Sequence, residues 1–141
     1  MELDELYQEI ILDHSKRPRN YGTLENATVR ARGENPSCGD EIEVHIKLTP
    51  EGQIEDIRFS GQGCAISQAS ASMMTLSAKG KSREEALQAY DFFQNMLVGE
   101  VPNPLPKMLG DARLLKGVRQ FPQRVKCATL GWQALRQALN S

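Results

Sequence analysis

The residues of this chain best suited to chemistry are its three cysteines and one aspartate near the first of them. Cys38 and Asp40 stand in "NPSCGDEIEV", Cys64 in "SGQGCAISQ" and Cys127 in "RVKCATLGW". A glycine turn tolerates aspartate, but it has no use for a thiol. Three thiolates and one carboxylate would complete a tetrahedral shell for zinc. These four residues are therefore the candidate metal ligands.

The surroundings of the cysteines favour this interpretation. Cys64 is expected at the start of a helix, where free backbone N–H groups stabilise a thiolate. Cys127 closely follows Arg124 and Lys126, and nearby cations lower a thiol pKa. Asp40 comes two residues after Cys38, so both side chains point to the same side of an extended chain. A shell of three thiolates, one carboxylate and a divalent cation would carry a formal charge of about -2.

Each of these residues also has an ordinary structural interpretation. Free cysteine is among the residue types most often buried, so a single thiol fits core filler better than ligand. Asp40 alone fits a turn or a strand cap. From the residues alone, metal binding and plain packing remain equal alternatives. The two histidines are expected away from any site, His14 exposed at a helix end and His45 on the solvent face of a strand.

The composition predicts one soluble domain covering residues 1–141. The chain has 141 residues, 40% hydrophobic and 25% charged, which is ordinary for a globular protein. A net charge of -1 provides no field for nucleic acid or anionic lipid. No signal peptide or membrane span is evident. Because three is an odd number of cysteines, a secreted disulfide framework is disfavoured, and we expect a cytoplasmic protein with reduced thiols.

The hydrophobic pattern changes from helix to strands and back to helices. Helical spacing predicts an amphipathic helix over the first dozen residues, through Leu3, Leu6, Tyr7, Ile10 and Ile11. Strict alternation from 40 to 48 predicts a half-buried strand, followed by a hairpin turn and a second strand from 54, with a bulge before 57. A weaker third strand is expected over 27–35.

The second half of the chain predicts helices. One follows the glycine turn, with Ile66, Ala69, Met73 and Leu76 on one stripe. Another begins at a capping box of Ser82 and Glu85, a shorter one is ended by Gly117 and "QFP" (120–122), and the last has Pro122 in its first turn. Strands followed by helices indicate an α+β fold, a small antiparallel sheet of about three strands with helices packed on one face.

Four stretches carry a resemblance to a known family. They are "LYQEIILDHSKRPRNYG", "NPSCGDEIEV", "FSGQGCAISQASASMM" and "RVKCATLGWQAL". In this order, over nearly the whole chain, they resemble the iron–sulfur assembly proteins that include IscU and SufU, the NifU N-terminal-like family. The SufU branch is the more similar, because Lys126 stands where IscU-type scaffolds have histidine before the third cysteine. Residues 102–123 also resemble a SufU-type insertion, and the "LPPVK" chaperone motif is absent.

The resemblance implies a site and a function. It implies one zinc ion on Cys38, Asp40, Cys64 and Cys127, with Cys38 accepting persulfide sulfur from a SufS-type, PLP-dependent cysteine desulfurase. Arg124 matches a basic position near the site. The expected function is a zinc-dependent sulfurtransferase that supplies downstream iron–sulfur assembly proteins. Whether it counts as an enzyme is a matter of definition, because the desulfurase breaks the C–S bond.

Two other functions stay open. A scaffold could build an iron–sulfur cluster on the same residues, since cysteine suits both metals. A purely structural zinc module is disfavoured, because it would gain little from placing Cys38 in a mobile glycine turn. A redox enzyme is disfavoured by the absence of a CxxC pair.

Overall fold

The computed structural model describes the backbone of residues 3–140 and the side chains of residues 8–140. The chain begins with α1 (Leu3–Lys16), followed by β1 (Val29–Asn35), β2 (Asp40–Leu48) and β3 (Ile54–Gln62). The helices α2 (Ala65–Ala78), α3 (Arg83–Val98), the 3₁₀ helix η1 (Lys107–Gln120) and α4 (Pro122–Leu139) complete it. The expected α+β order is confirmed. None of the described helices combines the length and apolar character needed to cross a membrane.

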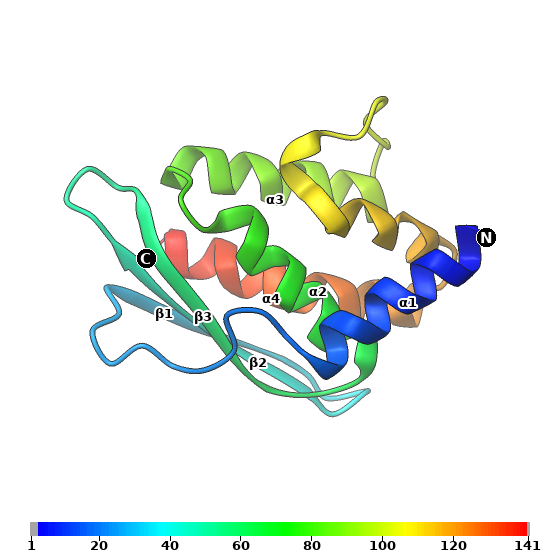
Figure 1. Cartoon of the computed structure of the whole chain (residues 1–141), viewed down its shortest axis with the longest axis horizontal. Helices are drawn as coiled ribbons and strands as arrows, with labels where there is room; N and C mark the ends of the chain where they lie inside the picture. Colours follow the sequence, from blue (N-terminus) through cyan, green and yellow to red (C-terminus); the bar gives the residue numbers. More distant parts are fainter. Residues whose placement is uncertain (1–2, 141) are drawn as a thin grey trace.

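The three strands form one antiparallel sheet in the order β1-β2-β3, with the helices on one face (Figure 1). Alternate residues of β2 face the helices and are fully buried, namely Ile42, Val44 and Ile46. Lys47 pairs with Asp56 while the next residue, Leu48, pairs with Ile54. One residue of β3 is therefore extra at this point, and the predicted bulge is confirmed.

His45 is not on a solvent face, and that prediction is wrong. It points away from the helices but is only 5% exposed. Segment 22–28 crosses the outer face of the sheet, from a backbone bond between Gly22 and Phe59 to one between Thr28 and Ile46. The His45 ring accepts the backbone N–H of Leu24 at Nδ1 (3.0 Å) and contacts Glu43 through Nε2. The alternating pattern placed His45 on the correct side of the strand, but it could not show that segment 22–28 covers that side.

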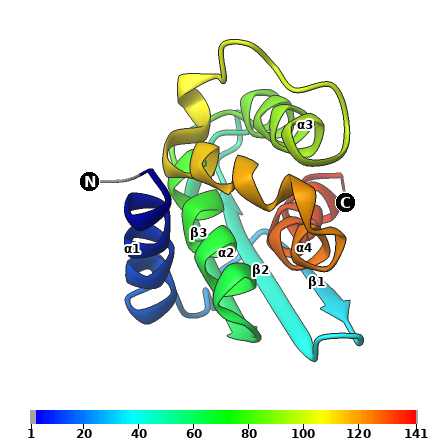
Figure 2. The ribbon, with the colours of Figure 1, turned by 90° about the vertical axis from the view of Figure 1, so that its right-hand side faces the viewer.

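The helices form the second layer, and α2 lies between α1 and α4 (Figure 2). Gly131 lets α4 approach α2, because a Cβ there would lie 3.0 Å from the Cβ of Ala71. Phe93 of α3 stacks on Trp132 of α4 with ring centroids 4.3 Å apart. The capping box of Ser82 and Glu85 at the start of α3 is confirmed. Of the expected first helical stripe, Leu3, Leu6 and Tyr7 lie outside the described side chains, and Ile11 is buried.

The segment before α4 is a 3₁₀ helix that continues past Gly117 and ends at Gln120, at the start of the "QFP" stretch expected to stop it. Its buried residues recur every third position, Leu109, Ala112, Leu115 and Val118. A 3₁₀ helix has three residues per turn, so this spacing places all four on one face. Gly110 adopts φ 54°, ψ -133° and kinks the segment near its start. Pro122 begins α4 as expected.

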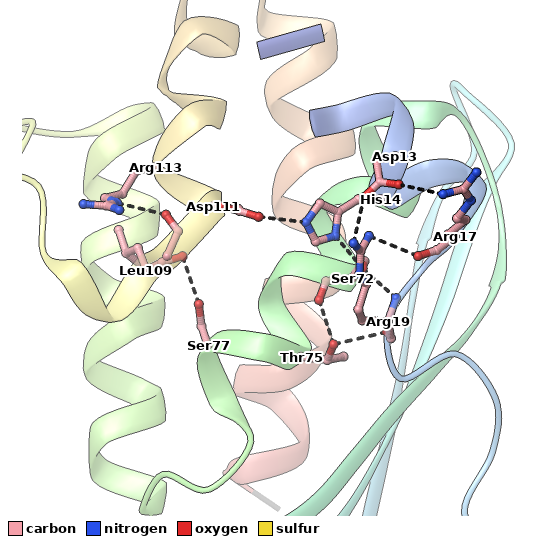
Figure 3. Close-up of polar contacts among 11 residues, drawn as sticks. Asp13, His14, Arg17, Arg19, Ser72, Thr75, Ser77, Leu109, Asp111 and Arg113 are labelled. Atoms are coloured by element: carbon pink, nitrogen blue, oxygen red, sulfur yellow. Dashed lines mark hydrogen bonds and ion pairs between the residues drawn. The ribbon is translucent and has the colours of Figure 1, made fainter. Parts of the chain in front are cut away.

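His14 is the second histidine whose predicted exposure is wrong, since it is 1% exposed. Its Nδ1 lies 2.8 Å from Ser72 Oγ on α2, and its Nε2 lies 3.1 Å from Asp111 Oδ2 on η1 (Figure 3). Ser72 Oγ also accepts the backbone N–H of Arg19 (2.8 Å). A neutral His14 ring can donate from Nε2 to Asp111 and accept the Ser72 hydroxyl at Nδ1. This arrangement satisfies the ring, the hydroxyl, the carboxylate and the Arg19 N–H together. Ser72 is fully buried, so the serine, histidine and aspartate join three elements and offer no accessible nucleophile.

Candidate metal centre

The four predicted ligands come from the beginnings of three elements at one end of the molecule (Figure 1). Cys38 lies in the turn between β1 and β2, and Asp40 is the first residue of β2. Cys64 is the N-cap of α2, and Cys127 lies in the second turn of α4. The fold thus brings together residues that are far apart in sequence.

Two sulfur atoms and one carboxylate form the compact part of the group. The ligand atoms of Cys38, Asp40 and Cys127 all lie within 4.8 Å of one another. Cys127 Sγ lies 3.7 Å from Cys38 Sγ. Cys64 joins the group through Asp40, with its Sγ 3.9 Å from Asp40 Oδ2.

Asp40 is held by the beginning of α2. Its Oδ1 accepts the backbone N–H of Cys64 at 2.8 Å, and the residue is only 1% exposed. This hydrogen bond uses one of the free N–H groups of the helix N-terminus, where negative charge is favoured. One N–H of the helix end predicted to stabilise the Cys64 thiolate therefore donates to the neighbouring carboxylate.

Glycines make room for this contact. A Cβ on Gly63 would overlap Asp40 Oδ1 and lie 2.6 Å from Ser67 Oγ. Gly61 has φ 135°, and a Cβ there would overlap the carbonyl oxygen of Glu41. The "SGQGC" stretch thus lets the backbone before Cys64 pass close against the start of β2.

Tyr21 supports the glycine turn from outside, a role that the sequence did not indicate. Its hydroxyl donates to the carbonyl of Gly61 at 2.9 Å, and its ring meets Phe59 edge-on with centroids 5.1 Å apart. The only sequence signal is its place before Gly22 in "RNYG", which is typical of a loop.

The three thiols differ in exposure and surroundings. Cys127 is 4% exposed, whereas Cys38 and Cys64 are exposed. Burial raises the pKa of the Cys127 thiol well above its ordinary range, and contacts with Asp40, Cys64 and Cys38 raise it further. The prediction that Arg124 and Lys126 lower this pKa is wrong. Both side chains are exposed, and Arg124 lies over the Phe121 ring, 4.7 Å from its centroid.

The donor set fits a tetrahedral metal ion. With a Zn–S bond near ~2.3 Å, two sulfurs of a tetrahedral shell lie roughly 3.8 Å apart. The Cys38–Cys127 separation of 3.7 Å meets this requirement before any movement of the chain. Thiolate sulfur suits zinc and iron–sulfur clusters alike. The geometry thus supports metal binding by Cys38, Asp40 and Cys127, and the participation of Cys64 stays a prediction.

Comparison with known proteins shows the family of this chain. The model of the NifU-like N-terminal domain matches residues 6–128, so the chain belongs to that family. It is 50% identical to the iron–sulfur cluster assembly scaffold protein IscU of Streptococcus pyogenes serotype M1, over 97% of this chain and 84% of that protein. It is 48% identical to the zinc-dependent sulfurtransferase SufU of Bacillus subtilis (strain 168), over 97% of this chain and 91% of that protein.

A solved structure agrees with these relatives. It is a candidate iron–sulfur cluster assembly scaffold protein for the SUF system from Fervidobacterium islandicum AW-1. Its TM-score is 0.86 at 38% identity, covering 96% of this chain and 97% of that one. The expected resemblance to IscU and SufU proteins is confirmed, and the chain is a member of this iron–sulfur assembly family.

Proposed function

We propose that this protein is a zinc-dependent sulfurtransferase that accepts persulfide sulfur from a SufS-type cysteine desulfurase for iron–sulfur cluster biosynthesis. The name of the Bacillus subtilis relative supports the activity. Lys126 before the third cysteine supports the same branch. Cys38, Asp40, Cys64 and Cys127 would hold the zinc ion.

Cys38 is the sulfur acceptor in this proposal, because it is the accessible thiol on the least constrained element. It lies in the short turn 36–39, where its N–H donates to Asn35 O at 3.1 Å and that of Gly39 donates to Pro36 O at 3.4 Å. Cys64, also exposed, begins a helix and is fixed through its N–H to Asp40. Cys127 lies in α4, and its side chain is buried. This difference in how the three thiols are held is the observation on which the assignment rests.

The transfer is a thiol exchange on a persulfide. The Cys38 thiolate attacks the outer sulfur of the desulfurase persulfide, and a new S–S bond forms at Cys38 Sγ. The S–S bond of the donor breaks, and its electron pair leaves on the desulfurase thiolate. No external oxidant or reductant is needed. When zinc is bound, its charge would keep the coordinating thiols deprotonated at neutral pH.

Persulfide trapping tests this assignment. The zinc-loaded protein is incubated without oxygen with a cysteine desulfurase and free cysteine, alkylated, and mapped by mass spectrometry. We expect one extra sulfur on Cys38, none in Cys38→Ser, and an unchanged yield in Ser37→Ala, which alters an exposed neighbour in the same turn. Full sulfur uptake by Cys38→Ser would contradict the proposal.

A cluster scaffold is the second candidate function, favoured by the 50% identity to a protein named as such. In that case the cluster is cargo built on the same cysteines. Metal analysis of protein purified without oxygen separates the two. One zinc per chain and no visible absorption support the sulfurtransferase, whereas iron with inorganic sulfide and a brown colour support the scaffold.

A further inference from the structure

Asn35 lies next to the candidate ligands but has not been assigned a part in the site. It is the last residue of β1 and pairs directly with Asp40 of β2, so both side chains share one face of the sheet. This face lies against α4, because a Cβ on Gly33 would approach Leu130 Cδ1 to 2.9 Å. Asn35 is two residues further along that face, and Cys127 lies one helical turn before Leu130.

The side chain of Asn35 has a buried donor with no partner. The residue is 8% exposed, and its Nδ2 makes no hydrogen bond among the described residues. A buried N–H group without an acceptor is costly, and such a group is uncommon in a folded protein. Its backbone carbonyl, by contrast, is used, since it accepts the N–H of Cys38 at the base of the turn.

Asp40 lies opposite Asn35 in the sheet and Cys38 follows it in the turn, so the acceptors brought to this position include sulfur as well as a carboxylate. A site of three thiolates and one carboxylate carries excess negative charge around a divalent ion, and N–H donors to sulfur offset it. The sulfur of a free thiol is only a weak hydrogen-bond acceptor, whereas a metal ligand is a thiolate. Metal binding would therefore supply a stronger acceptor for Asn35 Nδ2, which has no partner among the described residues.

We infer that Asn35 is a positioning residue of the metal centre, whose Nδ2–H donates to the thiolate sulfur of Cys127 or Cys38 once a metal is bound. Its amide thus stabilises the loaded site and contributes nothing to the metal-free fold. This inference rests on a metal centre at these residues, whether zinc or a cluster occupies it, and it does not depend on sulfur transfer.

The test uses zinc and cobalt with Asn35→Ala, Asn35→Asp and the wild-type chain. Zinc affinity, measured by competition with a chelator, should fall about 10-fold in Asn35→Ala and further in Asn35→Asp, which replaces the donor by a negative charge. In the Co(II)-loaded protein the sulfur-to-cobalt absorption band should move to longer wavelength, because sulfur loses a hydrogen bond that lowered its lone-pair energy. Asn26→Asp makes the same chemical change at an exposed position and should alter neither quantity.

Unfolding of the metal-free variants provides the discriminating measurement. Because the donor has no partner without metal, Asn35→Ala should unfold at the same urea concentration as the wild type or a higher one. An unchanged zinc affinity and cobalt band would overturn the inference. So would a loss of metal-free stability, including failure to fold, because the residue would then serve the fold itself. Neither result requires a desulfurase, so a failure of the sulfurtransferase proposal would be seen separately.

Discussion

The Sγ atoms of Cys38 and Cys127, 89 residues apart in the chain, lie 3.7 Å from each other. One sulfur belongs to an exposed turn and the other to the buried side of a helix. This pair defines one edge of the candidate coordination shell. It also makes a prediction about the protein without metal.

Removing the metal should expose this pair to oxidation. Treatment of the metal-free protein with diamide, which takes up two electrons and two protons, should form a Cys38–Cys127 disulfide in preference to any pair with Cys64. Two thiols already in van der Waals contact need only a small movement of the flexible turn to reach bonding distance. Peptide mapping after alkylation identifies the pair. Zinc loading should suppress the reaction, and a predominant Cys64 disulfide would contradict the observed geometry.

His14 should matter for stability, although it is remote from the metal centre. Replacing it by alanine removes the contacts with Ser72 and Asp111 and leaves the buried hydroxyl of Ser72 without one partner. We expect the free energy of unfolding to fall by about 1–3 kcal/mol, the typical cost of an orphaned buried polar group. Urea unfolding of the metal-free chain measures it.

Asp111→Asn is the matched control for that variant. The Asp111 side chain is 51% exposed, so the amide can retain a hydrogen bond and water can replace the rest. Its effect should stay below about 1 kcal/mol, as for other exposed polar pairs. Equal losses in both variants would mean that the stability comes from the hydrogen bond between His14 and Asp111 and not from the contact with buried Ser72.

Local sequence patterns predicted most of the fold. Alternation along β2 indicated which side chains share a face, and the offset between Ile54 and Ile57 indicated the bulge, because a half-buried sheet face imposes a period of two. The capping box and Pro122 marked helix starts through local backbone chemistry. Strand alternation, capping boxes and first-turn prolines depend only on residues that are close together in the chain, so the sequence is enough to predict them.

The errors concern contacts between distant segments. His14 and His45 look polar and exposed in their own elements, but η1 contacts the first and the 22–28 segment crosses the second. Arg124 stands three residues before Cys127 in sequence yet lies over Phe121 in the structure. The candidate ligands were found because cysteine is rare and chemically distinctive. The supporting Tyr21 and Asn35 are ordinary residues whose roles depend on the assembled geometry.

The glycine before Cys64 supplies the last prediction. Gly63→Ala places a methyl group against Asp40 Oδ1 and Ser67 Oγ, so either the carboxylate or the beginning of α2 must shift. Because Asp40 is the residue that joins Cys64 to the other two thiols, we expect zinc affinity to fall at least about 10-fold. Gly52→Ala is the control: its φ of 86° strains an alanine, but nothing lies within 4 Å of the added methyl. It should cost about 1 kcal/mol of stability and leave zinc binding unchanged. Competition with a chelator measures the zinc affinity, and urea unfolding measures the stability. A normal zinc affinity in Gly63→Ala would mean that Asp40 is not part of the metal centre.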